Sequence, residues 1–226
     1  MFKRPPCPGD MDDYVWVESK YRPHWRRKRG RVKKAVLNTG FEKSSDATAI
    51  VSPASKRVRQ ALAPFLRNIA TGPLHIRICN AFRRSLKEKG KLMLPYLDGL
   101  EMQRDYPLGG MLVCDYRVTF TRNNVRIEIP IYNGSVRASN SLVTHYYFEA
   151  VLLYGDTGTE KGLQTDATIS PLYLIHGTAE EKCALELPLP EGDDFCVLLK
   201  ISLLEGNQLA AHTKHYRMKV VGGRGM

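Results

Sequence analysis

Apolar residues that alternate with polar ones after residue 112 constrain the fold of this chain more than any other feature. Seven runs in this region are rich in β-branched and aromatic residues, and Gly, Asp, Asn and Pro separate them. The runs are 112–120, 124–131, 145–154, 168–176, 183–189, 196–204 and 215–221. Short strands with turn residues between them are typical of an antiparallel β-sandwich, and an immunoglobulin-like layout is one arrangement that fits.

The connections between these runs favour hairpins. The stretch "TRNN" at 121–124 predicts a turn, and "EGNQ" at 205–208 lies between the last two runs, which we expect to pair. The stretch "YGDTGTEKG" at 154–162 resembles a phosphate-binding loop but lacks the required spacing of Gly, Lys and Ser or Thr. We interpret it as a hairpin loop.

A helical period appears upstream, between residues 52 and 90. Ser52 offers an N-cap, and Pro53 suits the first helical position. Pro64 is expected to kink or split this first helix. Its apolar stripe consists of Val58, Leu62, Phe65 and Ile69.

A second helix is predicted from residue 74 onward. Leu74, Ile78, Phe82 and Leu86 repeat every four residues, and Gly90 supplies a stop. The stretch "TGP" at 71–73 separates the two helices, so they are expected to form a helical hairpin.

The N-terminal region predicts a pair of strands. Tyr14 and Trp16 alternate with Val15 and Val17, residues 19–23 suit a turn, and the basic run 24–34 would return as the partner strand. The sequence therefore predicts an α+β fold in two domains. Residues 1–91 form a basic arm with a helical hairpin, and residues 92–226 form the antiparallel β-sandwich.

Charge is divided unevenly between these two parts. The chain has a formal net charge of +11. Residues 1–91 contain 22 Lys and Arg against 7 Asp and Glu, whereas residues 92–226 contain 12 against 16. This asymmetry indicates a polyanionic partner or the acidic face of another copy, although solubility alone is the alternative interpretation.

The cysteines and the N-terminus suggest a cytoplasmic protein. Five scattered cysteines form no C-x-x-C pair, which favours a reducing compartment. The first residues lack the apolar run of a signal peptide, and no apolar stretch is long enough to predict a membrane span.

Candidate catalytic groups do not converge. Asp12–Asp13 and Asp193–Asp194 are adjacent pairs, so in an extended chain their carboxylates point to opposite faces and turn chemistry explains them better. His212 and His215 are three residues apart in a predicted strand, which also separates them. No nucleophile motif is present, and we expect no enzyme activity, no cofactor and no metal.

Aromatic and basic residues together give the strongest functional signal. Cations suit phosphates or carboxylates, and aromatic rings suit nucleic-acid bases. The alternative is that the rings pack into the fold while the cations are only solvated. The residues predicted to bind a partner are Arg22, Trp25, Arg26, Arg27, Lys28, Arg29, Arg31, Lys33, Lys34, Lys56, Arg57, Arg59, Arg83 and Arg84.

Several segments together resemble an uncharacterised family of proteins of about this length from Bacteroidota. They are the aromatic hairpin at 9–16, the basic segment 26–34, Phe41 with the basic helix 52–66, and the hairpin-like end 196–221. The chain departs from the family pattern at 37–46. The resemblance implies an N-terminal hairpin, basic helices and a β-rich C-terminal half, and it implies no activity.

These observations lead to a hypothesis about function. We expect a non-catalytic structural or interaction protein whose basic N-terminal half docks onto an acidic protein surface or another copy. The alternative is a nucleic-acid-binding protein with little sequence preference, and an enzyme of unknown class is the third hypothesis.

Overall fold

The computed structural model describes residues 14–17, 24–27, 39–138, 140–158, 162–178, 180–191, 194–206 and 208–225. Contacts between Cα atoms divide the chain into two units, Met1–Ser45 and Asp46–Met226.

The first unit contains a short antiparallel hairpin of β1 (Tyr14–Val17) and β2 (His24–Arg27). Trp16 lies directly opposite Trp25, and their rings meet edge to face with centroids 5.2 Å apart. Cross-strand aromatic pairs of this kind stabilise two-stranded hairpins. The predicted strand pair is therefore confirmed over these eight positions, whereas the predicted turn and residues 28–34 lie outside the described residues.

The second unit is built on two antiparallel sheets. The large sheet has the order β11–β9–β5–β6, with β10 also beside β9 and β7 also beside β5, and the small sheet has the order β3–β4–β8. The large-sheet strands are β5 (Val143–Gly155), β6 (Leu163–Ile169), β7 (Tyr173–Leu174), β9 (Phe195–Glu205), β10 (Gln208–Leu209) and β11 (Tyr216–Arg224). The small-sheet strands are β3 (Arg117–Phe120), β4 (Asn124–Ile131) and β8 (Glu181–Pro188).

The connectivity agrees with the predicted layout. If β3, β4, β5, β6, β8, β9 and β11 are taken as strands A, B, C, C′, E, F and G, the sheets are A–B–E and G–F–C–C′. This partition is that of an immunoglobulin-like sandwich with C′ in place of D. The fold is thus α+β with a sandwich in its C-terminal half.

The first hydrophobic core lies between the two sheets. Burial alternates along β4 and β8, where residues such as Ile127, Ile129 and Leu185 face inward. From the large sheet, Phe148 and Leu199 contribute to the same core. Alternation of this kind arises because only one face of the small sheet is covered.

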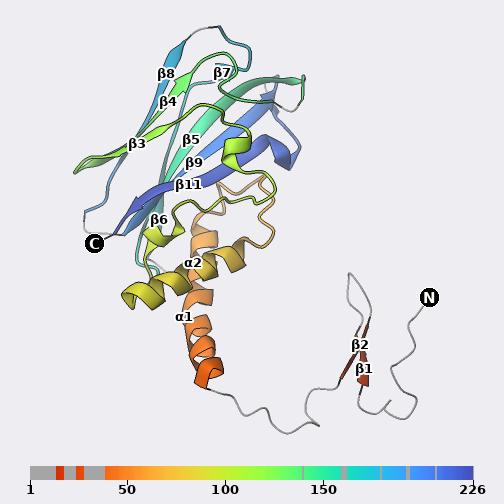
Figure 1. Cartoon of the computed structure of the whole chain (residues 1–226). Coiled ribbons are helices and arrows are strands. Elements are labelled where there is room, and N and C mark those ends of the chain that lie inside the picture. The colour runs from red at the N-terminus through yellow and green to blue at the C-terminus, as the bar shows by residue number, and fades with distance from the viewer. Residues whose placement is uncertain are drawn as a thin grey trace. The chain divides into compact units, whose positions relative to one another are not determined.

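The second core lies on the other face of the large sheet, where α2 (Leu74–Lys89) and the part of α1 (Thr39–Ala61) from Val51 onward pack, while the first half of α1 extends away from the sheets (Figure 1). Val58 of α1 and Phe82 of α2 pack in one cluster with Val151, Leu198 and Met218 of the sheet. The helices predicted for an N-terminal domain that ends at residue 91 therefore share a core with the sandwich.

The predicted start of the first helix was wrong. Helix α1 begins at Thr39, and Pro53 lies inside it instead of at its first turn. An interior proline removes one amide donor and costs about 3 kcal/mol. Val51 and Ala54 flank Pro53 and are completely buried, and this packing offsets the cost. The predicted break at Pro64 is confirmed, because α1 ends at Ala61.

The prediction for the second helix is confirmed. The stripe residues Leu74, Ile78 and Phe82 are buried, and Leu86 is half-buried. Gly90 ends α2 with φ of 70° in the left-handed region, and its amide donates to the Leu86 carbonyl.

Two predicted strands had the wrong bounds. The run 112–120 is a strand only from Arg117, and the run 168–176 is interrupted between β6 and β7. Most of β6 had no prediction, because it is an edge strand with largely exposed side chains and no apolar alternation. Among the described residues, neither helix is long and apolar enough to cross a membrane.

Candidate polyanion-binding face

The helical layer concentrates positive charge at the surface. Residues 46–91 contain ten Lys and Arg but only two acids, Asp46 and Glu88. One Glu88 oxygen accepts a hydrogen bond from the Tyr96 hydroxyl at 2.8 Å, and this bond raises the pKa of Tyr96. We call the exposed cations Lys56, Arg59, Arg83 and Arg84 the basic helical face. All four are among the predicted binding residues.

Arg57 was predicted to bind a partner together with these four residues, but it is less exposed than they are. It is half-buried, and its Nη1 donates to the Thr157 carbonyl at 2.7 Å. Arg57 thus fastens α1 to the chain that follows β5, so much of its hydrogen-bonding capacity serves the fold.

Arg83 joins the two helices at the surface. Its Nη1 donates to Oδ1 of Asn80 at 3.0 Å, one turn earlier on α2, and its Nη2 donates to Oγ1 of Thr48 on α1 at 3.1 Å. These bonds fix the orientation of a guanidinium that is still exposed. A fixed cation loses less side-chain entropy on binding than a free one.

Sequence reasoning missed Arg77, which lies two turns before Arg84 on α2. Its guanidinium donates to the carbonyls of Glu101 and Met102. Burial, followed by the nearby charge of Arg104, lowers the pKa of Arg77. Helical spacing alone could have placed Arg77 on the same face of α2 as Arg84. The two carbonyls that Arg77 contacts belong to a segment without a periodic pattern, so these contacts could not be predicted.

The predicted N-terminal residues are only partly described. Trp25 is half-buried against Trp16, and Arg26 and Arg27 lie opposite Val15 and Tyr14 in the register of the hairpin. The others lie outside the described residues, namely Arg22, Lys28, Arg29, Arg31, Lys33 and Lys34.

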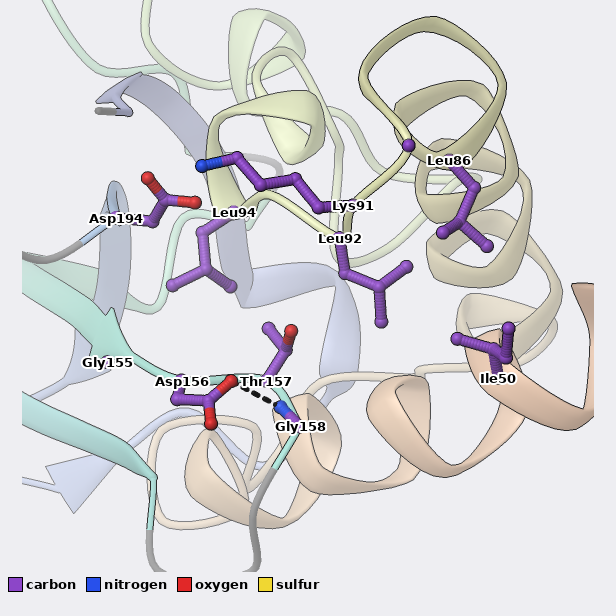
Figure 2. Close-up of a pocket in the computed structure, with 11 residues that line it drawn as sticks. Ile50, Leu86, Lys91, Leu92, Leu94, Gly155, Asp156, Thr157, Gly158 and Asp194 are labelled. Atoms are coloured by element: carbon purple, nitrogen blue, oxygen red, sulfur yellow. Dashed lines mark hydrogen bonds between the residues drawn. The ribbon is translucent and has the colours of Figure 1, made fainter.

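A pocket of about 590 Å³ opens between the two helices and the end of β5 (Figure 2). Ile50, Leu86 and Leu92 give it apolar walls, and Lys91 extends toward Asp194 across it. Its other carboxylate, Asp156, accepts a hydrogen bond from the Gly158 amide at 2.7 Å. This bond shapes a turn, and the antiparallel pairing of β5 with β6 confirms the hairpin predicted for 154–162.

The candidate catalytic groups form no reactive arrangement among the described residues. Asp12, Asp13 and Asp193 lie outside them. His212 accepts a hydrogen bond from the Lys214 amide, and its ring centroid lies 6.3 Å from that of His215. No group of three or more described His, Cys, Asp or Glu could hold a metal ion.

One contact between helices brings together residue types that occur in catalytic sites. Nδ1 of His75 lies 3.0 Å from Oγ of Ser55, and the Cys79 sulfur lies 3.8 Å from the His75 Nε2. Ser55 is completely buried and Cys79 is 5% exposed. A substrate has no access to either side chain, so this contact packs α1 against α2.

Two of the three acids on the strands of the small sheet, Glu128 and Glu186, already take part in ion pairs. Glu128 forms ion pairs with Lys182 at 2.9 Å and Arg126 at 3.3 Å, and Arg126 also lies 3.3 Å from Glu186. The hydrogen bond from Lys182 lowers the pKa of Glu128. This sheet therefore presents a mixed ladder of charges and no uniformly acidic surface.

Comparisons with known proteins give little further information. No protein-family model and no curated protein matches this chain. Among solved structures, R. palustris CsgH is similar with a TM-score of 0.24 and 7% identity, covering 48% of this chain and 90% of CsgH. β-Glucosidase 3B from Thermotoga neapolitana, in complex with glucose, is similar with a TM-score of 0.23 and 15% identity, covering 49% of this chain and 16% of the glucosidase. Similarity at this level establishes neither fold nor function.

Proposed function

We propose that this chain is a non-catalytic interaction protein that docks onto an acidic protein partner through its basic helical face. The observation that carries the proposal is the exposure of these four cations, together with Lys87 and Lys89, on two helices whose shared layer contains only two acids. The sandwich serves as a rigid support, because both faces of the large sheet are packed. The proposal includes a reducing, cytoplasmic setting, which the four buried cysteines without disulfides among the described residues support.

A second copy of the chain is a weaker candidate for the partner. Residues 92–226 carry four more acids than cations, but Glu128 and Glu186 already pair with Lys182 and Arg126. Docking the helices on that surface would exchange existing ion pairs for new ones, which gains little.

A single-stranded nucleic acid is also less favoured on this face. Binding of that kind combines cations with aromatic rings on which bases stack. Tyr96 is half-buried beside α2, and its hydroxyl is bonded to Glu88. The aromatic pair Trp16–Trp25 belongs to the other unit, where the two rings contact each other.

The test removes the basic helical face by changing Lys56, Arg59, Arg83 and Arg84 to Gln. Polyglutamate is the probe, and its affinity is measured by fluorescence anisotropy over a series of salt concentrations. We expect the affinity to fall at least about tenfold, because each lost contact is worth several tenths of a kcal/mol or more.

A matched control removes the same charge from the sandwich. Arg117, Arg122, Arg137 and Arg224 are exposed, and changing all four to Gln should reduce the affinity by less than about twofold. Equal losses in both variants would mean that only net charge matters, and the proposal would be wrong. Tighter binding to oligo-dT than to polyglutamate would favour the nucleic-acid alternative, and a self-assembled particle in light scattering would favour the second copy.

A further inference from the structure

A groove of about 510 Å³ runs along α2 where the helix faces the short 3-10 helix η2 (Leu94–Leu97) and the residues that follow it. We call it the α2 groove. Its walls and floor are Arg77, Asn80, Ala81, Arg83 and Arg84 from α2 and residues 96–100 from the facing segment.

The floor of the α2 groove is apolar. Ala81 and Leu97 are 3% and 1% exposed, and the half-buried Leu100 packs against the second core. If the cations served only to keep protein molecules apart, the groove between them would not need an apolar floor. Because Ala81 and Leu97 are already almost fully buried, the free energy that an apolar partner side chain gains comes mainly from covering Leu100 and from its own removal from water.

The facing wall is held in place before any partner binds. The Gly99 amide donates to the Val220 carbonyl, the Val220 amide to the Leu100 carbonyl, and the Met102 amide to the Met218 carbonyl. The wall is thus hydrogen-bonded along the edge of β11, and the Arg77 guanidinium ties it to α2 through two carbonyls. A preformed groove avoids the entropic cost of ordering on binding.

Charge around the groove is mainly positive. Arg77, Arg83 and Arg84 lie on the helical side, and the exposed carboxylate of Asp98 lies on the other. Arg77 is engaged with backbone carbonyls, whereas Arg84 is exposed.

We propose that the α2 groove binds an acidic segment of a partner protein that also carries a bulky apolar side chain. The apolar side chain covers the half-buried Leu100 in the groove, and carboxylates meet the exposed Arg83 and Arg84. This inference rests on the proposed function and adds the chemistry of the segment that is recognised. Tyr96 lines the groove, but it is half-buried and its hydroxyl is bonded to Glu88, so the groove offers little ring surface for stacking bases and suits an acidic segment better than a nucleic acid.

The test uses two labelled peptides of equal length and charge. In one, Glu alternates with Leu, and in the other, Glu alternates with Ser. We expect the wild-type protein to bind the Glu–Leu peptide at least about tenfold more tightly than the Glu–Ser peptide.

Variants of the groove then locate the binding. Asn80→Trp fills the groove without changing charge, and it should abolish the preference for the Glu–Leu peptide. Asn80→Ala is its control, because it also breaks the bond to Arg83 but leaves the groove open, so the preference should persist. Asp98→Asn should strengthen binding of both peptides by about two- to fivefold, whereas Asp166→Asn on the opposite edge of the sheet should not.

The outcomes separate the two proposals. If both peptides bind equally and the variant that lacks the basic helical face loses affinity for both, the groove inference fails and the proposed function stands. If that variant binds polyglutamate as tightly as the wild type, the proposed function fails. If oligo-dT displaces neither peptide and Asn80→Trp removes the preference for leucine, the groove inference holds. If oligo-dT binds and neither peptide does, the groove inference is overturned.

Discussion

His215 lies in the 3-10 helix η4 (Thr213–His215) with 1% of its surface exposed. Its Nε2 is 3.9 Å from a Glu205 oxygen, and its buried Nδ1 has no hydrogen-bond partner among the described residues. Burial lowers the pKa of His215 below 6.5, and the charges of Lys214 and Arg217 and the His212 ring lower it further, against Glu205. The folded protein therefore holds this ring neutral at a pH where the unfolded chain already binds a proton.

The sign of the pH dependence follows from this difference. Above pH 6.5 both states are neutral at this site and the full stability is present. As pH falls below 6.5 the unfolded state binds more protons, so the free energy of unfolding falls by up to about 1.4 kcal/mol per pH unit. We expect His215→Gln to remove this component from urea titrations at pH 7.5 and 5.5. His176→Gln, a change at an exposed histidine, should retain the wild-type dependence, and an unchanged pH slope in His215→Gln would contradict the prediction.

At the scale of elements, the central strands β5 and β9 carry an ion pair inside the protein. Glu149 and Lys200 are neighbours in register, and Lys200 Nζ lies 2.9 Å from Glu149 Oε2. Each residue is 8% exposed, and both lie on the helix-covered face with Val151 and Leu198. A buried pair of this kind is costly to break because the remaining charge has no partner.

A double-mutant cycle tests this account of the strand pair. Lys200→Met alone and Glu149→Leu alone should each lower the free energy of unfolding by about 3–5 kcal/mol. The double variant should lose much less than the sum of the two, because two apolar side chains replace both charges at once. Urea denaturation of the four proteins gives the coupling energy. Additive losses would show that the two charges are solvated separately.

Elements with at least one buried face were predictable from sequence, whereas largely exposed segments were not. The alternation of β4 and the stripe of α2 reflect burial on one side, which a periodic pattern records directly. The edge strand β6 is mostly polar, and residues 39–50 of α1 are mainly small and polar with no apolar stripe. In β9, ten successive residues are buried. Such a run indicates that both faces of the strand are covered, but it does not show that helices cover one of them.

The candidate site was likewise predictable only where a local periodic pattern records it. Helical period identified Lys56, Arg59, Arg83 and Arg84 as outward positions, and all four are exposed. The α2 groove could not be predicted, because residues 96–100 are held beside α2 by hydrogen bonds to β11 and by side-chain contacts with α2 itself, and no local pattern records either.

At the scale of the whole molecule, the division at Ser45 separates the N-terminal hairpin from the core. Within the described part of the chain, neither hydrophobic cluster includes a residue before Val51. A chain that lacks residues 1–38 should therefore melt within about 3 °C of the full-length protein, since it retains every described member of both clusters. Thermal denaturation monitored by circular dichroism measures this.

The same truncated chain separates the two basic regions. If the basic helical face is sufficient for docking, the affinity of the truncated chain for polyglutamate should fall only by the contribution of the cations in residues 1–38. Its preference for the Glu–Leu peptide should persist. Loss of that preference would show that residues 1–38 are needed at the groove. A large drop in melting temperature would show that the arm belongs to the cooperative unit.

The second core has a consequence for biosynthesis. Its members extend from Val51 near the start of the chain to Val220 near its end, and the sheet between them needs β5, β9 and β11. On the ribosome the two helices emerge first, with their apolar stripes exposed, and more than a hundred residues must follow before the last covering strand exists. Contacts of such long range fold slowly and leave hydrophobic surface open in the meantime. We therefore expect the apolar stripes of α1 and α2 to be the surface of the nascent chain most prone to aggregation until β11 has been synthesised.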